Sequence, residues 1–263
     1  MYKTIVVPID GSDLAARAVP PAAWLAGRFG AELHLVTTTF AADIAGEEDA
    51  LRQAAEHAGS VPVRTEVIRH AFPANGILDV AQADDEALLC LSTRGTSGLQ
   101  TFLLGSVSDE VVRRAKRPIV LVGPECGPPA DADARLLVCV DGSDTAAAAL
   151  PVTADWALAL GIDPDVVLVA DAHRLASFRE TAEAEVEDAA ATLRQRGLHP
   201  TARLHEGSHP ARSIVAVADE THASIIVLTT QGAGARFGAA LGHVATDVVR
   251  HAHVPVLVVP AVQ

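Results

Sequence analysis

Residues 4–12, TIVVPIDGS, join a short apolar run to an Asp-Gly-Ser turn, and the chain uses this combination twice. The turn Asp10-Gly11-Ser12 returns 131 residues later in LLVCVDGS, residues 136–143. A second motif repeats near the end of each copy: VVRRAKRPIVLV at 111–122 matches VVRHAHVPVLVV at 248–259, with an offset of 137. The chain of 263 residues is therefore predicted to hold two copies of one domain of ordinary size.

A third repeat lies between these two, since PANGI at 73–77 returns as PARSI at 210–214. The offset grows from 131 to 137 along the copies, which predicts a short insertion in the middle of the second copy. Glycine, proline and aspartate between the copies favour neither helix nor strand. The sequence thus predicts a first domain at 1–124, a linker at 125–134 and a second domain at 135–263.

Each copy alternates short apolar runs with longer amphipathic stretches. Short runs rich in branched residues are typical of parallel strands buried on both faces. They are predicted at 4–9, 32–37, 63–69, 87–92 and 118–122, and again at 136–140, 165–171, 201–206, 224–229 and 255–259. Helices are expected near 13–29, 47–58, 74–84 and 105–115. This alternation predicts an α/β fold of two tandem doubly wound Rossmann-like domains, each a five-stranded parallel sheet with helices on both faces.

Prolines interrupt the first predicted helix of each copy. Pro20 and Pro21 fall within 13–29, and Pro151 falls within its counterpart. A proline inside a helix removes a hydrogen bond and costs about 3 kcal/mol. A kink or a break is therefore expected at both places.

Composition excludes several function classes. The formal charge is −13 and hydrophobic residues make up 49% of the chain, so a disordered protein is excluded and binding to nucleic acid or to a membrane surface is disfavoured. Three well-separated cysteines suggest neither a zinc knuckle nor a redox pair. With no signal-peptide pattern and no apolar run near 18 residues, a cytoplasmic location is expected.

Two loops of each copy are candidate ligand sites, because ligands bind at the carboxyl ends of strands in open α/β sheets. Asp10 follows the first strand and returns as Asp141. Helix capping explains Ser12 and leaves Asp10 unexplained, so a ligand role for Asp10 is favoured. The loop 92–108 is glycine-bearing and runs into a helix, whose backbone N–H groups can hold phosphate without net positive charge. Capping by Ser106 is the alternative.

The Asp-Gly-Ser turn after the first strand, the glycine-bearing loop after the fourth strand and the VVR motif before the fifth strand resemble, in this order, the universal stress protein family. The two copies resemble its tandem-domain members. The likeness covers nearly the whole chain outside the linker. The nucleotide-binding branch carries Gly-x-x-Gly, nine residues, then Gly-Ser or Gly-Thr. Gly95 and Gly105-Ser106 match this pattern, although Ser92 replaces the initial glycine. The resemblance implies an ATP site, with Mg²⁺ through the nucleotide, formed by Ile9, Asp10, Val36, Leu91, Gly95, Gly105, Ser106, Val107 and Ser108.

The second copy departs further from the pattern, so the resemblance implies a weaker site there. Asp141, Gly232 and Gly242 remain, whereas His243 replaces the serine and Ala245 replaces the later hydroxyl. Thr229 stands in place of the initial glycine. Losing one hydrogen bond to a charged group costs about 1.5–3 kcal/mol. We therefore expect one competent nucleotide site and one degenerate site.

Three functions are compatible with these patterns. The favoured one is a nucleotide-dependent regulatory module in stress response, with at most slow ATP hydrolysis, no catalytic residues and no protein-bound metal. The alternative is a non-nucleotide interaction scaffold of the same fold, with an unknown protein partner. A true ATPase or phosphotransferase ranks last because kinase and P-loop signatures are missing. The glycines of 232–238 are too widely spaced for a dinucleotide fingerprint. The two copies are expected to pair about a pseudo-twofold through 118–122 and 255–259, and a homodimer is compatible with this.

Overall fold

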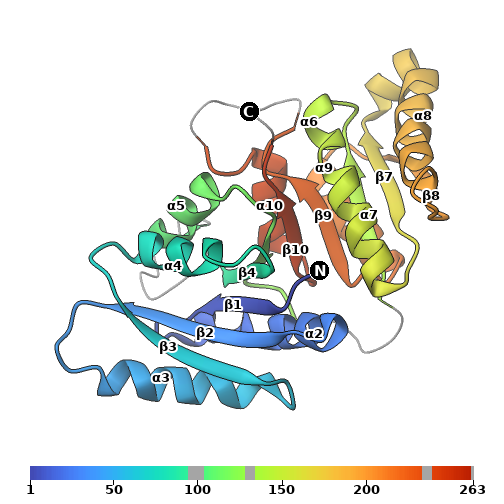
Figure 1. Ribbon diagram of the computed structural model, residues 1–263. Helices are drawn as coiled ribbons and strands as arrows, with labels where there is room; N and C mark the ends of the chain where they lie inside the picture. Colours follow the sequence, from blue (N-terminus) through green and yellow to red (C-terminus); the bar gives the residue numbers. More distant parts are fainter. Residues whose placement is uncertain (94–103, 128–133, 233–238, 262–263) are drawn as a thin grey trace. The chain divides into compact units, whose positions relative to one another are not determined.

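The chain folds into two compact units, residues 1–128 and 129–263 (Figure 1). The computed structural model describes residues 1–93, 104–127, 134–232 and 239–261. No helix within the described ranges is both long enough and apolar enough to cross a bilayer.

The first unit is built on a five-stranded sheet in the order β3-β2-β1-β4-β5, and every pairing in it is parallel. The strands are β1 (Thr4–Pro8), β2 (Glu32–Thr39), β3 (Val63–Arg69), β4 (Ala87–Ser92) and β5 (Ile119–Val122). The chain adds strands on one side of β1 up to β3 and then crosses to the other side at β4. The strand order therefore reverses between β1 and β4, the place where open α/β sheets commonly bind ligands.

Helices follow the strands as the alternation predicts. They are α1 (Asp13–Ala16), α2 (Val19–Phe29), α3 (Ala45–Ala55) with the 3₁₀ turn η1 (Glu56–Ala58), α4 (Pro73–Gln82) and α5 (Ser106–Arg114). Figure 1 shows α3 and α4 on opposite sides of the β2–β3 ribbon. Gly76 lets α4 lie close to the sheet, because a Cβ there would be only 3.1 Å from the Thr38 methyl group.

The predicted interruption of the first helix is confirmed. Ser12 caps α1, which ends after one turn at Ala16, and α2 begins at Val19. Pro20 and Pro21 lie in the first turn of α2, where a backbone N–H has no acceptor within the helix, so proline is tolerated. The counterpart divides in the same way, with Pro151 in the first turn of the later helix.

The second unit repeats the architecture with the strand order β10-β9-β6-β7-β8, again parallel throughout. Its strands are β6 (Leu136–Val140), β7 (Asp165–Ala170), β8 (Thr201–Glu206), β9 (Ile225–Thr229) and β10 (Val256–Val259). Its helices are α6 (Asp144–Ala147), α7 (Ala149–Leu160), α8 (Ala172–Arg194), α9 (Pro210–Glu220) and α10 (His243–His251). The inserted residues fall between β7 and β8, where α8 has 23 residues against 11 in α3.

The core of both units consists mainly of Ala, Val, Leu and Ile, in keeping with the 3% aromatic content, although Trp156 is fully buried as well. The central strands β1, β4, β6 and β9 are almost wholly buried. The expectation that the strands are covered on both faces is wrong for β3 and β8, whose residues are largely exposed. Both carry charged side chains, such as Arg64 and Arg203, which suit the outer position and oppose unwanted strand pairing.

Candidate functional site

A cavity of about 370 Å³ opens where the strand order of the first unit reverses. It lies at the carboxyl ends of β1, β2 and β4 and at the N-terminus of α5. Eight of the residues proposed from the sequence line it together: Ile9, Asp10, Val36, Leu91, Gly105, Ser106, Val107 and Ser108. Gly95 lies outside the described residues. These eight residues come from the ends of three strands and the start of one helix, and they are up to 99 positions apart.

Asp10 is held in place by the turn that follows it. Ser12 donates its backbone N–H and its hydroxyl to Oδ1 of Asp10, at 3.0 and 2.5 Å. Gly11 between them has φ +80°, a left-handed conformation that favours glycine. The turn thus fixes a carboxylate on the wall of the cavity.

The N-terminus of α5 forms another part of the cavity wall. Its N-cap is Gly105, which has φ −60° and ψ 159° and supplies no side-chain acceptor to the first turn. Backbone N–H groups at such a helix start, with the positive end of the helix dipole, favour an anion. Ser106 is exposed here, whereas the hydroxyl of Ser108 donates to the backbone carbonyl of Ser92 at 3.0 Å. Ser106 is therefore the more accessible hydroxyl of the two.

Several residues that line the first cavity are not among those proposed from the sequence. Thr38 and Glu47 line it, and Oε1 of Glu47 accepts a hydrogen bond of 2.6 Å from the hydroxyl of Thr39. Pro73 and Ile77 of α4 line it as well. A signal for the last two was present, since PANGI is one of the repeated segments. No comparable pattern marked Glu47.

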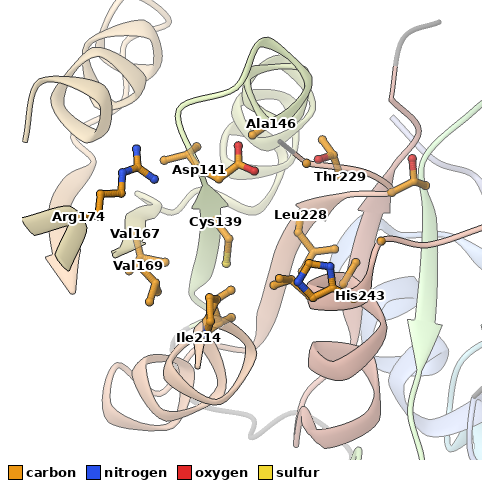
Figure 2. Close-up of a pocket in the computed structure, with 17 residues that line it drawn as sticks. Cys139, Asp141, Ala146, Val167, Val169, Arg174, Ile214, Leu228, Thr229 and His243 are labelled. Atoms are coloured by element: carbon orange, nitrogen blue, oxygen red, sulfur yellow. The ribbon is translucent and has the colours of Figure 1, made fainter. Parts of the chain in front are cut away.

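The second unit has a cavity of about 250 Å³ at the corresponding place (Figure 2). The four residues proposed for the weaker site, Asp141, Gly232, Gly242 and His243, all line it. Pro210 and Ile214 occupy the places of Pro73 and Ile77. Both cavities therefore use the same elements of the repeat.

The second cavity differs from the first in its polar groups. Asp141 accepts from the N–H and hydroxyl of Ser143 at 3.0 and 2.5 Å, as Asp10 does from Ser12. Its other oxygen lies against Gly232, where a Cβ would clash with it. Arg174 of α8 lines this cavity and donates to Glu185 of the same helix at 2.5 Å. The sequence patterns marked neither of these α8 residues.

The cysteines of the described residues differ in their exposure. Cys90 is buried, whereas Cys139 is half-buried and lies on the wall of the second cavity. Burial raises the pKa of both thiols well above the ordinary value. Within the described ranges, no three His, Cys, Asp or Glu side chains are grouped closely enough to hold a metal ion.

The fold and its cavities define a class of protein: two doubly wound Rossmann-like α/β units in tandem, each open at the reversal of its strand order. The sequence model of the Universal stress protein family matches residues 1–40, 38–123 and 134–260. The chain therefore belongs to the universal stress protein family, as a member with two copies of the domain.

Curated relatives agree with this assignment. A universal stress protein of Thermus aquaticus is 34% identical over 136 residues, which cover 46% of this chain and 99% of the relative. One from Methanocaldococcus jannaschii is 29% identical over 141 residues, covering 46% of this chain and 82% of the relative. A universal stress protein of Mycobacterium tuberculosis is 28% identical over 186 residues, covering 67% of this chain and 62% of the relative.

Solved structures share the two-unit fold. The crystal structure of a universal stress protein from Archaeoglobus fulgidus has a TM-score of 0.68 and 22% identity, covering 98% of each chain. A Pseudomonas aeruginosa protein described as functionally unknown has a TM-score of 0.63 and 20% identity, covering 99% of this chain and 93% of that one. At these identities the likeness supports the fold.

Proposed function

We propose that the first unit binds ATP and that its occupancy makes the protein a nucleotide-dependent regulatory module in stress response. One observation carries the proposal: a single cavity is lined by apolar side chains, by a fixed carboxylate and by the uncapped start of a helix. A molecule with a flat ring, hydroxyls and an anionic tail matches those three features in that order.

The ring and ribose are assigned to the end formed by the strands. Ile9, Val36 and Leu91 provide apolar contact for a base, and Asp10 accepts hydrogen bonds from hydroxyls. The phosphates are assigned to Gly105, Ser106, Val107 and Ser108 at the start of α5, with Gly95 from the loop before it. Amides and hydroxyls hold a polyanion there although the whole chain carries a formal charge of −13. Mg²⁺ would enter with the phosphates, and we assign it no protein ligand.

Binding rather than turnover is proposed. Among the described residues that line the first cavity there is no lysine or arginine to stabilise the charge of a phosphoryl-transfer transition state. Any hydrolysis is therefore expected to be slow. An ATP-dependent change in the surface of the protein would carry the regulatory signal to a protein partner.

An interaction scaffold without nucleotide is the second candidate. It is favoured by Ser92, which stands where the nucleotide-binding pattern has glycine, and by the hydroxyl of Ser108, which already donates to the Ser92 carbonyl. In that case the surface formed by the two copies is the functional part. We retain the pairing of residues 118–122 with 255–259, and a possible homodimer, as predictions of the sequence.

Analysis of bound nucleotide separates the two candidates. Freshly purified protein is denatured, and the released small molecules are identified by chromatography and mass spectrometry. ATP or ADP at about one per chain is expected for the proposed site. Absence of nucleotide, together with no thermal shift in millimolar MgATP, would favour the scaffold. Phosphate release at saturating ATP would instead point to a true ATPase.

A further inference from the structure

We infer that the cavity of the second unit takes a neutral nucleoside, a ring compound with hydroxyls and no phosphate chain, so that the two copies bind different classes of ligand. This inference rests on the proposed function in one respect, because it treats the first cavity as the nucleotide-binding version of the same design. At some corresponding positions the two cavities have similar residues, and at others they differ. Both the similarities and the differences favour this ligand.

The apolar wall at the strand ends, to which the base is assigned in the first unit, is similar in the second unit. Val140, Val167 and Leu228 line the second cavity at the places of Ile9, Val36 and Leu91. Val169 stands where the first cavity has Thr38, so the wall is more apolar. Figure 2 shows Val167, Val169, Leu228 and Ile214 around the interior, with Arg174 and His243 on opposite sides of it. An apolar ring fits this end of the cavity.

The carboxylate is also retained. Asp141 lines the cavity and is fixed by two hydrogen bonds from Ser143. A carboxylate accepts hydrogen bonds and donates none, so it calls for donors on the ligand. The adjacent hydroxyls of a ribose supply such donors, which a purely apolar molecule lacks. The cavity therefore favours a nucleoside over a hydrocarbon.

The start of α10 lacks the serines to which phosphate binding is assigned at the start of α5. Gly242 still caps α10 without a side chain, but His243 and Ala245 replace the two serines of the first unit. Figure 2 shows the His243 ring beside Leu228, where the first unit has a small hydroxyl. The volume is smaller too, about 250 Å³ against 370 Å³. A triphosphate therefore finds an imidazole in place of the exposed serine hydroxyl, and less room.

A second acidic group lies beside the Asp-Gly-Ser turn of the second unit. The Glu185 carboxylate lies against Gly142, with both oxygens 2.5 Å from the position that a Cβ would take. In the first unit, the atom nearest to the same position on Gly11 is the Cβ of Ala50, at 3.7 Å. Glu185 therefore places its carboxylate beside a turn whose counterpart in the first unit has an alanine methyl group as its nearest neighbour.

The neighbouring cation is not available to a phosphate chain, because the guanidinium of Arg174 already donates to Glu185. The first cavity has a second carboxylate as well, that of Glu47, which lines the cavity and accepts from Thr39 at the carboxyl end of β2. The two units thus differ in where the second carboxylate lies. Since the Arg174–Glu185 pair adds no net charge, the described residues that line the second cavity include no uncompensated arginine for a polyanion, which favours a neutral ligand.

Equilibrium dialysis with radiolabelled adenosine tests the inference on the full chain. MgATP is first added to saturation, so that the first cavity is filled, and adenosine is then titrated. One adenosine per chain is expected to bind in the presence of ATP. Adenosine without its 2′ and 3′ hydroxyls should bind roughly ten- to a hundredfold more weakly, because contacts with Asp141 are lost.

Matched variants assign the binding to the second unit. Asp141→Asn should abolish ATP-resistant adenosine binding, whereas Asp10→Asn should lower the affinity for ATP and leave that binding in place. Circular dichroism confirms that each variant is folded. As a gain-of-function arm independent of Asp141, the triple change Glu185→Gln, His243→Ser and Ala245→Ser should raise the ATP stoichiometry from one to two per chain.

Several results would overturn the inference. They are two ATP bound by the wild-type chain, complete displacement of adenosine by ATP, adenosine binding that survives Asp141→Asn, and no second ATP in the triple variant. Failure of the proposed function looks different. In that case ATP does not bind at all, while adenosine still binds in a manner that depends on Asp141 and not on Asp10.

Discussion

Ser12 binds Asp10 twice, through its backbone N–H at 3.0 Å and its hydroxyl at 2.5 Å, and both donors meet the same carboxylate oxygen. The Ser12 hydroxyl oxygen also accepts from the backbone N–H of Ala15 at 3.1 Å. One side chain therefore caps α1 and holds the carboxylate on the cavity wall. Ser143 makes the same three contacts in the second unit.

Replacing these serines should separate stability from binding. Ser12→Ala and Ser143→Ala each remove a helix cap and should lower the free energy of unfolding by about 0.5–2 kcal/mol. Ser12→Ala should also weaken ATP binding, because Asp10 loses the hydroxyl donor, whereas Ser143→Ala should leave ATP binding unchanged. Chemical denaturation and calorimetric titration measure the two effects. Equal losses of ATP affinity in both variants would contradict the assignment of the site to the first unit.

A methyl group at Gly232 should disturb the second cavity. Its Cβ would clash with Oδ2 of Asp141, so the carboxylate must move. Gly232→Ala is therefore expected to weaken adenosine binding roughly tenfold or more and to leave ATP binding unchanged. Gly127→Ala is the matched control, since a Cβ there has no atom of the described residues within 4 Å. Unaltered adenosine binding in Gly232→Ala would show that Asp141 is not placed as described.

The stability of the protein should fall as the pH is lowered, in part because of His34. Its side chain is buried and Nε2 lies 2.9 Å from Glu66, while Nδ1 has no hydrogen-bond partner among the described residues. Burial, with the nearby Arg64, lowers the pKa of His34 despite Glu66. The unfolded chain then binds a proton that the folded chain does not, so the free energy of unfolding decreases as the pH falls below about 6.5.

Denaturant titrations between about pH 5 and 8 measure this effect, with a slope of up to about 1.4 kcal/mol per pH unit from one group. His34→Gln should flatten the curve below about pH 6.5. His57→Gln, at an exposed position, should keep the slope of the wild type. A curve for His34→Gln that follows the wild type would exclude His34 as the titrating group.

The three thiols should react slowly in the folded protein. Burial raises the pKa of Cys126 to about 12 and also raises the pKa of Cys90 and Cys139. Since the thiolate is the nucleophile, alkylation by iodoacetamide at about pH 8 should be at least about a hundredfold slower than in denaturant. Mass spectrometry follows each cysteine separately. Rapid native labelling of Cys139 would mean that the second cavity is more open than the structure shows.

Local chemistry explains what could be predicted from the sequence. Pro20 and Pro21 require a helix start or a break whatever the tertiary fold, and the repeated Asp-Gly-Ser turn marked both carboxylates. The alternation of apolar runs with amphipathic stretches indicated a doubly wound parallel sheet. Residues of both candidate sites then lie together because the carboxyl ends of neighbouring parallel strands meet at one edge.

Tertiary contacts explain what could not be predicted. Glu185 lies against Gly142 through the tertiary packing of α8, and nothing in the local sequence indicates where that helix packs. Arg174 lines the cavity from the start of the same helix. The hydrogen bond from Ser108 to the carbonyl of Ser92 depends on how α5 approaches β4 across 16 residues of sequence. Contacts between residues far apart in the sequence are set by the packing of whole elements, so they leave no periodic pattern in the sequence.

Whether the first unit is the ATP site is measured by calorimetric titration with MgATP on the wild type and on the paired variants Ser106→Ala and His243→Ala. We predict one ATP per chain for the wild type, roughly ten- to a hundredfold weaker binding for Ser106→Ala, and unchanged binding for His243→Ala. Weaker binding in His243→Ala alone, or no heat and no thermal shift in the wild type at millimolar ATP, would contradict the assignment of the ATP site to the first unit.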